Sequence, residues 1–211
     1  MGKGLFITLE GNDGCGKTTQ GNLIMQYLTS EGYEVIHIRE PGGTNISEKI
    51  REIILDKDNG EMDDITEVML YASARTQVVR EVISPALDDG KIVLCDRYVD
   101  SNYAYQGYGR GVDIEVVEKV NEIATDGVMP DVTFFFDISP DVAMSRRLSV
   151  SDADRLELLG DDFYNKVYFG YKELVKKDPE RIIPINADNT PEKVFSDVKE
   201  ILDQKILEWR R

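Results

Sequence analysis

The sequence GNDGCGKT at residues 11–18 follows a short apolar run at 5–9 and opens a helical pattern at 17–30. It has the form G-x-x-x-x-G-K-[ST], and a strand before it and a helix after it are typical of a phosphate-binding loop, or P-loop. The glycines let backbone N–H groups turn toward phosphate oxygens, and the helix N-terminus adds partial positive charge. A chance match in an irregular loop would lack this context, so the segment predicts a nucleotide phosphate site.

Two side chains of this loop have predicted roles in nucleotide binding, and a third is unusual. Lys17 would reach the β- and γ-phosphates, and Thr18 would hold Mg²⁺ through its hydroxyl. Asp13 is unusual because a carboxylate in an anion-binding loop is costly unless a cation or a donor meets it. We interpret it as an acceptor for a hydroxyl of a second substrate's sugar, with a local cap or a contact in the magnesium shell as the alternative. The nucleotide-binding residues predicted here are Gly11, Asn12, Asp13, Gly14, Cys15, Gly16, Lys17, Thr18 and Thr19.

Short apolar runs alternate with longer helical patterns along the whole chain. The runs predict strands at 5–9, 34–39, 92–95, 132–138 and 181–186, and the patterns predict helices at 17–30, 46–55, 65–88, 114–125, 140–148, 161–177 and 191–209. Almost continuously apolar strands are buried on both faces, as in a parallel sheet covered by helices. Pro85 should bend or interrupt the third helix near its end. We therefore predict one α/β domain over 1–211, a doubly wound five-stranded parallel sheet with ligands at the carboxyl ends of its strands.

The composition limits the classes of function. With 211 residues, 41% hydrophobic and 31% charged, the chain suits one soluble globular domain. A net charge of −15 argues against a nucleic-acid partner and an anionic membrane surface. Cys15 and Cys95 have no metal-ligand or disulfide spacing, so we expect free thiols in a cytoplasmic protein. His37 lies in a strand-like run and is interpreted as structural rather than as a general base. There is no signal peptide and no apolar run of about 18 residues, so we expect no membrane span.

Three further segments resemble the thymidylate kinases: REPGGT at 39–44, YASAR at 71–75 and DRYVDSNYAYQG at 96–107. The last of these is much more specific than a P-loop, and the similarity continues in order from the first strand to the last helix. The resemblance implies an enzyme that transfers the γ-phosphoryl group of ATP to dTMP, giving ADP and dTDP for dTTP synthesis. It also implies Mg²⁺ as cofactor and a homodimer.

The resemblance assigns residues to the phosphates of the two substrates. Asp96 ends an apolar strand, where its carboxylate would help to order Mg²⁺ and its waters. Arg97 would contact the monophosphate, a role that suits the planar donors of a guanidinium. Arg51 matches another phosphate contact of the family; an exposed, solvated arginine is the alternative.

The resemblance also assigns the nucleoside contacts. Tyr71 would stack on thymine, although an ordinary core aromatic is the alternative, and Arg75 lies four residues on, on the same helix face. Arg75 would donate to a thymine oxygen, Asn102 would read the pyrimidine edge, and Tyr105 would crowd C2′ of the sugar. The predicted dTMP-binding residues are Asp13, Glu40, Pro41, Arg51, Tyr71, Arg75, Arg97, Ser101, Asn102, Tyr105 and Gln106. The nearby Tyr98, Tyr103 and Tyr108 are assigned to packing or to a loop.

A short lid is predicted at about 148–159. Thymidylate kinases take one catalytic arginine from the P-loop or from the lid, and Gly14 stands where the first type has arginine. In the step DRLE at 154–157, Arg155 is the lid candidate, so the predicted catalytic residues are Lys17, Asp13, Arg97 and Arg155. Arg146 and Arg147 end the preceding helix, and the resemblance implies that such residues lie near the adenine or the phosphates; Arg147 is assigned to ATP. For both, favourable interaction with the dipole at a helix C-terminus is the alternative.

Two other functions remain as alternatives. One is a kinase for another nucleoside monophosphate, which Asn102 and Arg75 disfavour. The other is a nucleotide-binding switch or regulatory subunit without a second substrate. A protein of that kind binds no second substrate and would not need Arg51, Arg97 and Tyr105 in addition to its P-loop.

Overall fold

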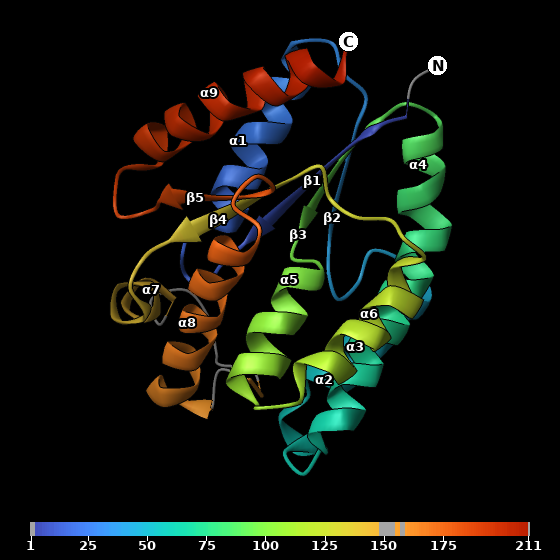
Figure 1. Cartoon of the computed structure of the whole chain (residues 1–211), viewed down its shortest axis with the longest axis vertical. Helices are drawn as coiled ribbons and strands as arrows, with labels where there is room; N and C mark the ends of the chain where they lie inside the picture. Colours follow the sequence, from blue (N-terminus) through green and yellow to red (C-terminus); the bar gives the residue numbers. More distant parts are fainter. Residues whose placement is uncertain (1–2, 148–154, 157–158, 211) are drawn as a thin grey trace.

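The predicted five-stranded parallel sheet forms the centre of the molecule (Figure 1). The structure is a computed structural model and describes residues 3–147, 155–156 and 159–210. Its strands lie in the order β2-β3-β1-β4-β5, with the bounds β1 Leu5–Glu10, β2 Val35–Arg39, β3 Ile92–Asp96, β4 Val132–Asp137 and β5 Ile182–Asn186. In the middle of the sheet, Ile7 of β1 lies between Leu94 of β3 and Val132 of β4. Each predicted strand is confirmed to within a residue at either end.

Alternate side chains of the central strand pack on opposite faces of the sheet. Ile7 and Leu9 join the core beneath helices α1 (Lys17–Ser30) and α9 (Pro191–Trp209). Phe6 belongs to a second core cluster on the other face, with Val79 and Ile83. Because all strands run in one direction, their carboxyl ends lie at one edge of the sheet, where the P-loop connects β1 to α1.

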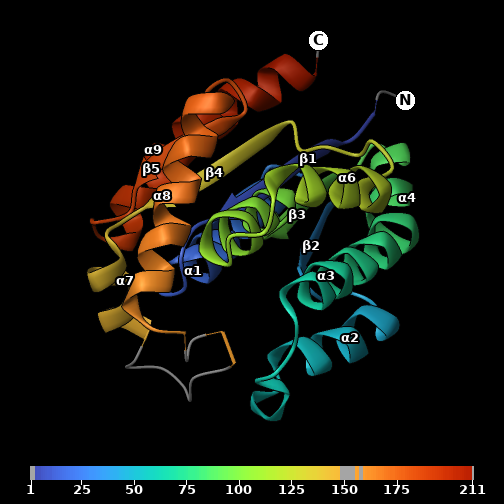
Figure 2. The ribbon, with the colours of Figure 1, turned by 60° about the horizontal axis from the view of Figure 1, so that its bottom comes forward.

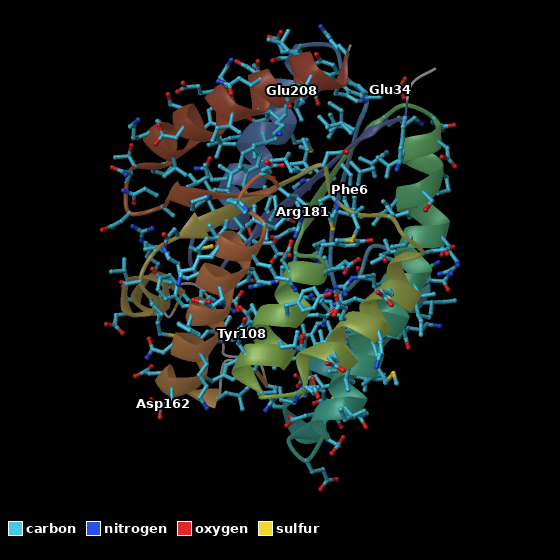
Figure 3. The ribbon with its side chains drawn as sticks, viewed as in Figure 1. Phe6, Glu34, Tyr108, Asp162, Arg181 and Glu208 are labelled. Atoms are coloured by element: carbon cyan, nitrogen blue, oxygen red, sulfur yellow. The ribbon has the colours of Figure 1, made fainter. Side chains whose placement is uncertain are left out.

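Further helices of the described residues lie toward one or the other side edge of the sheet (Figure 2). Helices α2 (Asn45–Leu55) and α3 (Asp64–Val78) lie on the β2 side, with the short 3-10 helix η1 (Lys57–Asn59) between them in the chain. Helices α7 (Pro140–Arg147) and α8 (Asp161–Lys177) lie on the opposite side, as Figure 2 shows. Helix α6 (Ile114–Thr125) packs on α3. In Figure 3, Glu34 and Glu208 lie at the end where β1 begins, and Tyr108 and Asp162 at the opposite end.

Pro85 interrupts the third predicted helix as expected. Helix α3 continues through a π-helical turn, η2 (Val79–Ile83), into α4 (Ser84–Asp88). Proline has no N–H, and its ring needs space beside the carbonyl four residues earlier. The wider π turn lies directly before Pro85 and meets both requirements.

The segment after β3 is a correction to the sequence analysis, which predicted no helix between 96 and 113. It forms a turn of α-helix, α5 (Val99–Asn102), that continues as the π-helix η3 (Tyr103–Gly109). Most of its side chains are buried, polar ones included, so it has no exposed polar face and no helical alternation. Gly107 and Gly109 further reduce its helix propensity. π-helical turns frequently mark functional sites, and this one forms a wall of the pocket described below.

Two further expectations concern the lid and the membrane span. Of the predicted lid at 148–159, residues 148–154 and 157–158 lie outside the described residues. Among the helices that are described, none has the length and apolar character needed to cross a membrane.

Candidate active site

Two adjoining pockets lie at the carboxyl ends of the strands. The larger, of about 750 Å³, is lined by the P-loop, and the smaller, of about 80 Å³, by residues of α3, α5 and η3. Four residues line both pockets: Asp13, Glu40, Arg51 and Arg97. A ligand in each pocket would therefore meet the other beside two arginines.

The P-loop holds its lysine inside the loop. The Nζ of Lys17 donates to the backbone carbonyls of Gly11, at 2.9 Å, and Asn12, at 3.0 Å. Only 6% of Lys17 is exposed. Gly11 and Asn12 themselves do not line the pocket. The other residues predicted to bind the nucleotide do: Asp13, Gly14, Cys15, Gly16, Lys17, Thr18, Thr19 and Arg147.

The backbone conformation and the close neighbours of Gly14 explain why the loop has glycine rather than arginine at this position. Its φ is +84°, a left-handed conformation that favours glycine. A Cβ added there would lie 2.0 Å from the backbone oxygen of Ala143 in α7. Any side chain at Gly14 would therefore require α7 to move.

Arg97 is fixed at the junction of the two pockets by its backbone and by four side chains. Its φ of 69° is unusual for a residue other than glycine, and such strain clusters at functional sites. One terminal nitrogen, Nη2, donates to Asp13 Oδ1 at 2.7 Å and to the Tyr105 hydroxyl at 3.0 Å. The other, Nη1, donates to the hydroxyls of Ser101 at 3.2 Å and Tyr171 at 3.3 Å.

The charge of Asp13 is stabilised by its neighbours. Burial opposes ionisation of this carboxyl group, but the positive charges of Arg97 and Lys17 outweigh it and lower its pKa to about 2. Its other oxygen accepts a hydrogen bond from the Tyr105 hydroxyl at 3.2 Å. Asp13 is therefore an ionised acceptor between the two pockets, as its predicted sugar contact requires.

The P-loop pocket contains side-chain oxygens that could bind a magnesium ion. Thr18 and Asp96 both line it. Oδ1 of Asp96 is buried and has no hydrogen-bond partner among the described residues. Mg²⁺ prefers a few protein oxygens together with water and phosphate. The part of the chain that is described contains no cluster of three or more acidic, cysteine or histidine side chains that could hold a metal.

The smaller pocket has a buried arginine at its far end. Arg75 is 1% exposed, and its Nε donates to Glu40 Oε2 at 2.7 Å. Its Nη1 donates to Oδ1 of Asn102 and, at 2.7 Å, to Oδ1 of Asn121. The guanidinium also lies 5.0 Å from the ring centre of Tyr98. Asn121 and Tyr98 are supporting residues that the sequence analysis missed or assigned to packing alone.

A chain of polar side chains fixes the amide groups at this end. The Nδ2 of Asn102 donates to Gln106 Oε1 at 2.9 Å, and the Nε2 of Gln106 donates to Glu67 Oε1 at 2.9 Å. Because the ionised carboxylate of Glu67 can only accept hydrogen bonds, it fixes which end of the Gln106 amide faces Asn102. Glu67 is fully buried and also pairs with Arg110 at 2.7 Å.

All residues predicted to bind dTMP line the smaller pocket, together with Leu55 and Leu156, which were not predicted. Tyr105 is 5% exposed, and its ring lies 4.8 Å from the Arg97 guanidinium. Tyr71 is half-buried and lies on the pocket wall, as both stacking on a base and packing against the core would require. Arg51 is half-buried and donates to the Pro41 carbonyl at 3.1 Å, so it is not the freely solvated side chain considered as its alternative.

Arg155 lies at neither pocket. It is 5% exposed, and its Nε donates to the Ile54 carbonyl at 2.7 Å while Nη2 pairs with Glu67 at 2.6 Å. The expectation from the resemblance was a side chain over the transferring phosphoryl group. In this arrangement Arg155 would have to leave a buried ion pair to reach that position.

A buried glutamate at the end of β1 was also missed. Glu10 is fully buried and accepts four hydrogen bonds, from the backbone N–H groups of Tyr98 and Ser101 and from the hydroxyls of Ser101 and Tyr171. Burial and the nearby charge of Asp100 raise its pKa to about 7. Its partners come from segments 88 to 161 residues away, and no local pattern identifies them.

Further residues line the P-loop pocket. Arg146 was considered together with Arg147 as a residue near ATP, and the others were not predicted: Gln20, Arg39, Ala187, Asn189, Pro191 and Val194. Arg146 donates to the Ala187 carbonyl at 3.0 Å, so it joins the end of α7 to the loop after β5.

Comparisons with known proteins agree with this geometry. The family profile described as Thymidylate kinase matches residues 9–198. The chain is 52% identical over 204 residues to a thymidylate kinase of Thermoanaerobacter sp. (strain X514), an alignment that covers 97% of this chain and all of the relative. It is 49% identical over 204 residues to one from Clostridium novyi (strain NT), covering 96% of this chain and all of that one. The crystal structure of thymidylate kinase from Ehrlichia chaffeensis has a TM-score of 0.78 and 33% identity, covering 95% of this chain and 99% of that one.

Proposed function

This chain belongs to the thymidylate kinase family, and we propose that its two adjoining pockets bind ATP and dTMP with their phosphates meeting at Arg97. The enzyme transfers a phosphoryl group to dTMP. The main support for this arrangement is the set of four residues that line both pockets. The set consists of two arginines and two carboxylates: Arg51, Arg97, Asp13 and Glu40. Two phosphate groups brought together repel each other, and two guanidinium groups at the junction reduce that repulsion.

The larger pocket is assigned to ATP. Lys17 would exchange its two carbonyl partners for β- and γ-phosphate oxygens, and the backbone N–H groups of 14–18 would surround the phosphates. Arg147 and Arg146 line the same pocket and would contact the remainder of the nucleotide. Thr18 and Asp96 would hold Mg²⁺, which when bound supplies positive charge to the phosphate oxygens.

The smaller pocket is assigned to dTMP. Arg97 and Arg51 would bind its phosphate, and Asp13 would accept a hydrogen bond from its sugar. Tyr71 would cover the base, whose oxygens and N–H would meet Arg75 and Asn102. The pocket is small because its own polar side chains are paired with one another. Arg97 would therefore exchange a partner such as Asp13 for the phosphate when dTMP enters.

Transfer in this arrangement needs no general base. The attacking group is an oxygen of the dTMP phosphate, which is already anionic, so the protein contributes position and positive charge. Lys17 would face the transferred group from the ATP pocket, and Arg97 would face it from the junction of the two pockets. His37, the only histidine of the chain, is half-buried in β2 and is not among the residues that line either pocket.

A coupled assay of ADP release tests this assignment. We expect release that depends on dTMP, and an Arg97→Lys variant with a raised KM for dTMP and an unchanged KM for ATP. The lysine keeps the charge but loses the planar pair of donors. ADP release at the same rate without dTMP would support a nucleotide switch and contradict the proposal.

The enzyme is further proposed to be a homodimer that associates through α2, α3 and α6. Large apolar side chains are exposed on these helices: Ile46, Ile53, Ile65, Met69 and Ile123, with exposed fractions between 43% and 75%. Helix α3 packs against both α2 and α6. Exposed apolar side chains that gather on neighbouring helices indicate an association surface, and a second copy would cover both surfaces at once.

Light scattering after gel filtration tests the dimer. We expect twice the chain mass of 23.9 kDa for the natural sequence and a smaller mass for Ile123→Lys. Leu207→Lys on α9, also at an exposed aliphatic residue, is the matched control and should leave the mass unchanged. A monomeric natural chain would contradict the dimer.

The cytoplasm is the expected location, since reducing conditions would keep the buried Cys15 and Cys95 as free thiols.

A further inference from the structure

Arg97 depends on two hydroxyl groups that could each be either donor or acceptor. Its Nη1 donates to Ser101 Oγ at 3.2 Å and to Tyr171 Oη at 3.3 Å. A hydroxyl carries one hydrogen and can point it in several directions. Both hydroxyls can accept from Arg97 only if their own hydrogens point elsewhere.

Glu10 takes both of those hydrogens. Its Oε2 lies 2.6 Å from Ser101 Oγ and 2.8 Å from Tyr171 Oη, and both hydroxyls donate to it. The two hydroxyl oxygens lie 3.0 Å apart, within reach of each other as well. An ionised carboxylate only accepts, so it holds both hydroxyl hydrogens and disfavours the alternative arrangement in which one of the two hydroxyls donates to the other.

The orientation of Glu10 is itself fixed. Its Oε1 accepts from two backbone N–H groups, that of Tyr98 at 2.7 Å and that of Ser101 at 3.3 Å. Backbone N–H groups can only donate, so the atom at the position of Oε1 must be an acceptor. A glutamine in place of Glu10 would therefore keep its oxygen toward them and would place its NH₂ group where Oε2 now lies.

From this geometry we infer that Glu10 is a positioning residue for the dTMP phosphate site: it orients the Ser101 and Tyr171 hydroxyls so that both accept from Arg97. Glu10 acts through Arg97 and is not part of either pocket lining. The inference rests on the proposed contact between Arg97 and the dTMP phosphate. Without Glu10, one hydroxyl would donate to the other and compete with Arg97 for that oxygen, and the guanidinium would lose part of its support.

The test uses Glu10→Gln, Tyr171→Phe, the double variant and Arg97→Lys, each assayed at pH 8 for kcat and for both KM values. Glu10→Gln should raise the KM for dTMP by at least about tenfold, because hydrogen bonds to a charged group are lost and a donor faces the two hydroxyls. The KM for ATP should not change. Tyr171→Phe should raise the KM for dTMP by a smaller factor. In the double variant, the KM should rise by less than the product of the two single factors, because both changes remove the hydrogen bond between Tyr171 and Glu10.

A matched control separates positioning from general damage to α8. Tyr168 lies one turn before Tyr171 on the same helix, and its hydroxyl donates to Asp137 at 2.8 Å instead. Tyr168→Phe should therefore leave the KM for dTMP unchanged. Tyr171→Phe keeps the ring that stacks on Phe135 at 5.1 Å, so it remains informative if Glu10→Gln does not fold.

The outcomes separate this inference from the proposal beneath it. If Arg97→Lys raises the KM for dTMP while Glu10→Gln and Tyr171→Phe do not, the role of Glu10 is wrong and the role of Arg97 stands. A KM that rises equally for ATP and dTMP in Glu10→Gln would also overturn the role of Glu10. An unchanged KM for dTMP in Arg97→Lys would overturn the phosphate contact and the inference together.

Discussion

The two ends of the active site are built in different ways. The ATP end is a contiguous loop, residues 11–18, in which backbone groups form the site and Lys17 is held by carbonyls of its own loop. The dTMP end is assembled from side chains of α2, α3, α5 and η3 and of the segment after β2, and several of them are held by further buried polar groups. Arg75 is held by Glu40, Gln106 by Glu67, and Arg97 by hydroxyls that Glu10 orients.

This difference has consequences for mutation. At the ATP end, one side chain carries most of the chemistry, and its loss should remove activity without disturbing the fold. At the dTMP end, function is shared among side chains that support one another, so single changes should alter affinity, specificity and stability together. The predictions below test this contrast.

Lys17→Ala should have the largest effect. It removes the charge that faces the β- and γ-phosphates, so kcat should fall by at least about a thousandfold, while the melting temperature changes little. A coupled assay and thermal unfolding measure both. Lys193→Ala, on the exposed face of α9, is the control and should keep full activity. Activity within a few fold of the natural enzyme would refute the assignment of Lys17.

The same contrast explains what could be predicted from the sequence. The P-loop, α1 and all five strands were predicted because their signals are local: a motif, a helical pattern and apolar runs. The residues proposed to contact dTMP were identified through a resemblance, and they all line one pocket. Nothing in the spacing of Arg97 and Tyr105 would have brought Asp13, 84 residues away, against Arg97.

The supporting residues could not be predicted, because their partners are distant in the chain. Glu10 contacts Tyr171 across 161 residues, and Glu67 contacts Arg155 across 88. Helices α5 and η3 were missed because Asn102 and Gln106 are buried polar residues, which removes the alternation that predicts a helix. Buried polar groups of this kind are visible only once the fold places them together.

Tyr105→Ala should have the next largest effect, on sugar choice. Tyr105 is proposed to press against C2′ while Asp13 accepts from the 3′-hydroxyl, so a 2′-hydroxyl would be crowded and without a partner. The natural enzyme should prefer dTMP over its ribose counterpart by a factor on the order of 10², in kcat/KM. The variant should lose most of that preference by using the ribonucleotide better. An unchanged ratio would show that Tyr105 does not select the sugar.

Arg155→Met distinguishes two roles of the lid arginine. In this structure Arg155 pairs with Glu67, next to Leu156 on the dTMP pocket wall, so its loss should raise the KM for dTMP roughly tenfold and lower the melting temperature. The role implied by the resemblance predicts a fall in kcat much larger than any rise in KM. Steady-state kinetics decide between them, and a dominant fall in kcat would show that the ion pair opens during transfer.

The smallest expected effect is a pH dependence of stability. The pKa of Glu10 is raised to about 7 in the folded chain, above its value of 4.5 without the fold. The folded state therefore binds this proton more tightly, and the stabilisation is present at low pH and lost as pH rises from about 4.5 to about 7. Across this range the melting temperature of the natural enzyme should fall by a few degrees relative to Glu10→Gln. A constant or rising difference would contradict the assignment.

The base specificity of the dTMP end tests the whole arrangement most directly. The measurement is kcat/KM of the natural enzyme for dTMP, dUMP, dCMP and dGMP. Arg75 and Asn102 should favour thymine, dUMP should be a poorer but real substrate because it lacks only the methyl group, and dCMP should be rejected because its amino group would face the donors of Arg75. Efficient turnover of dCMP or dGMP would contradict the account of this pocket while leaving the P-loop assignment unchanged.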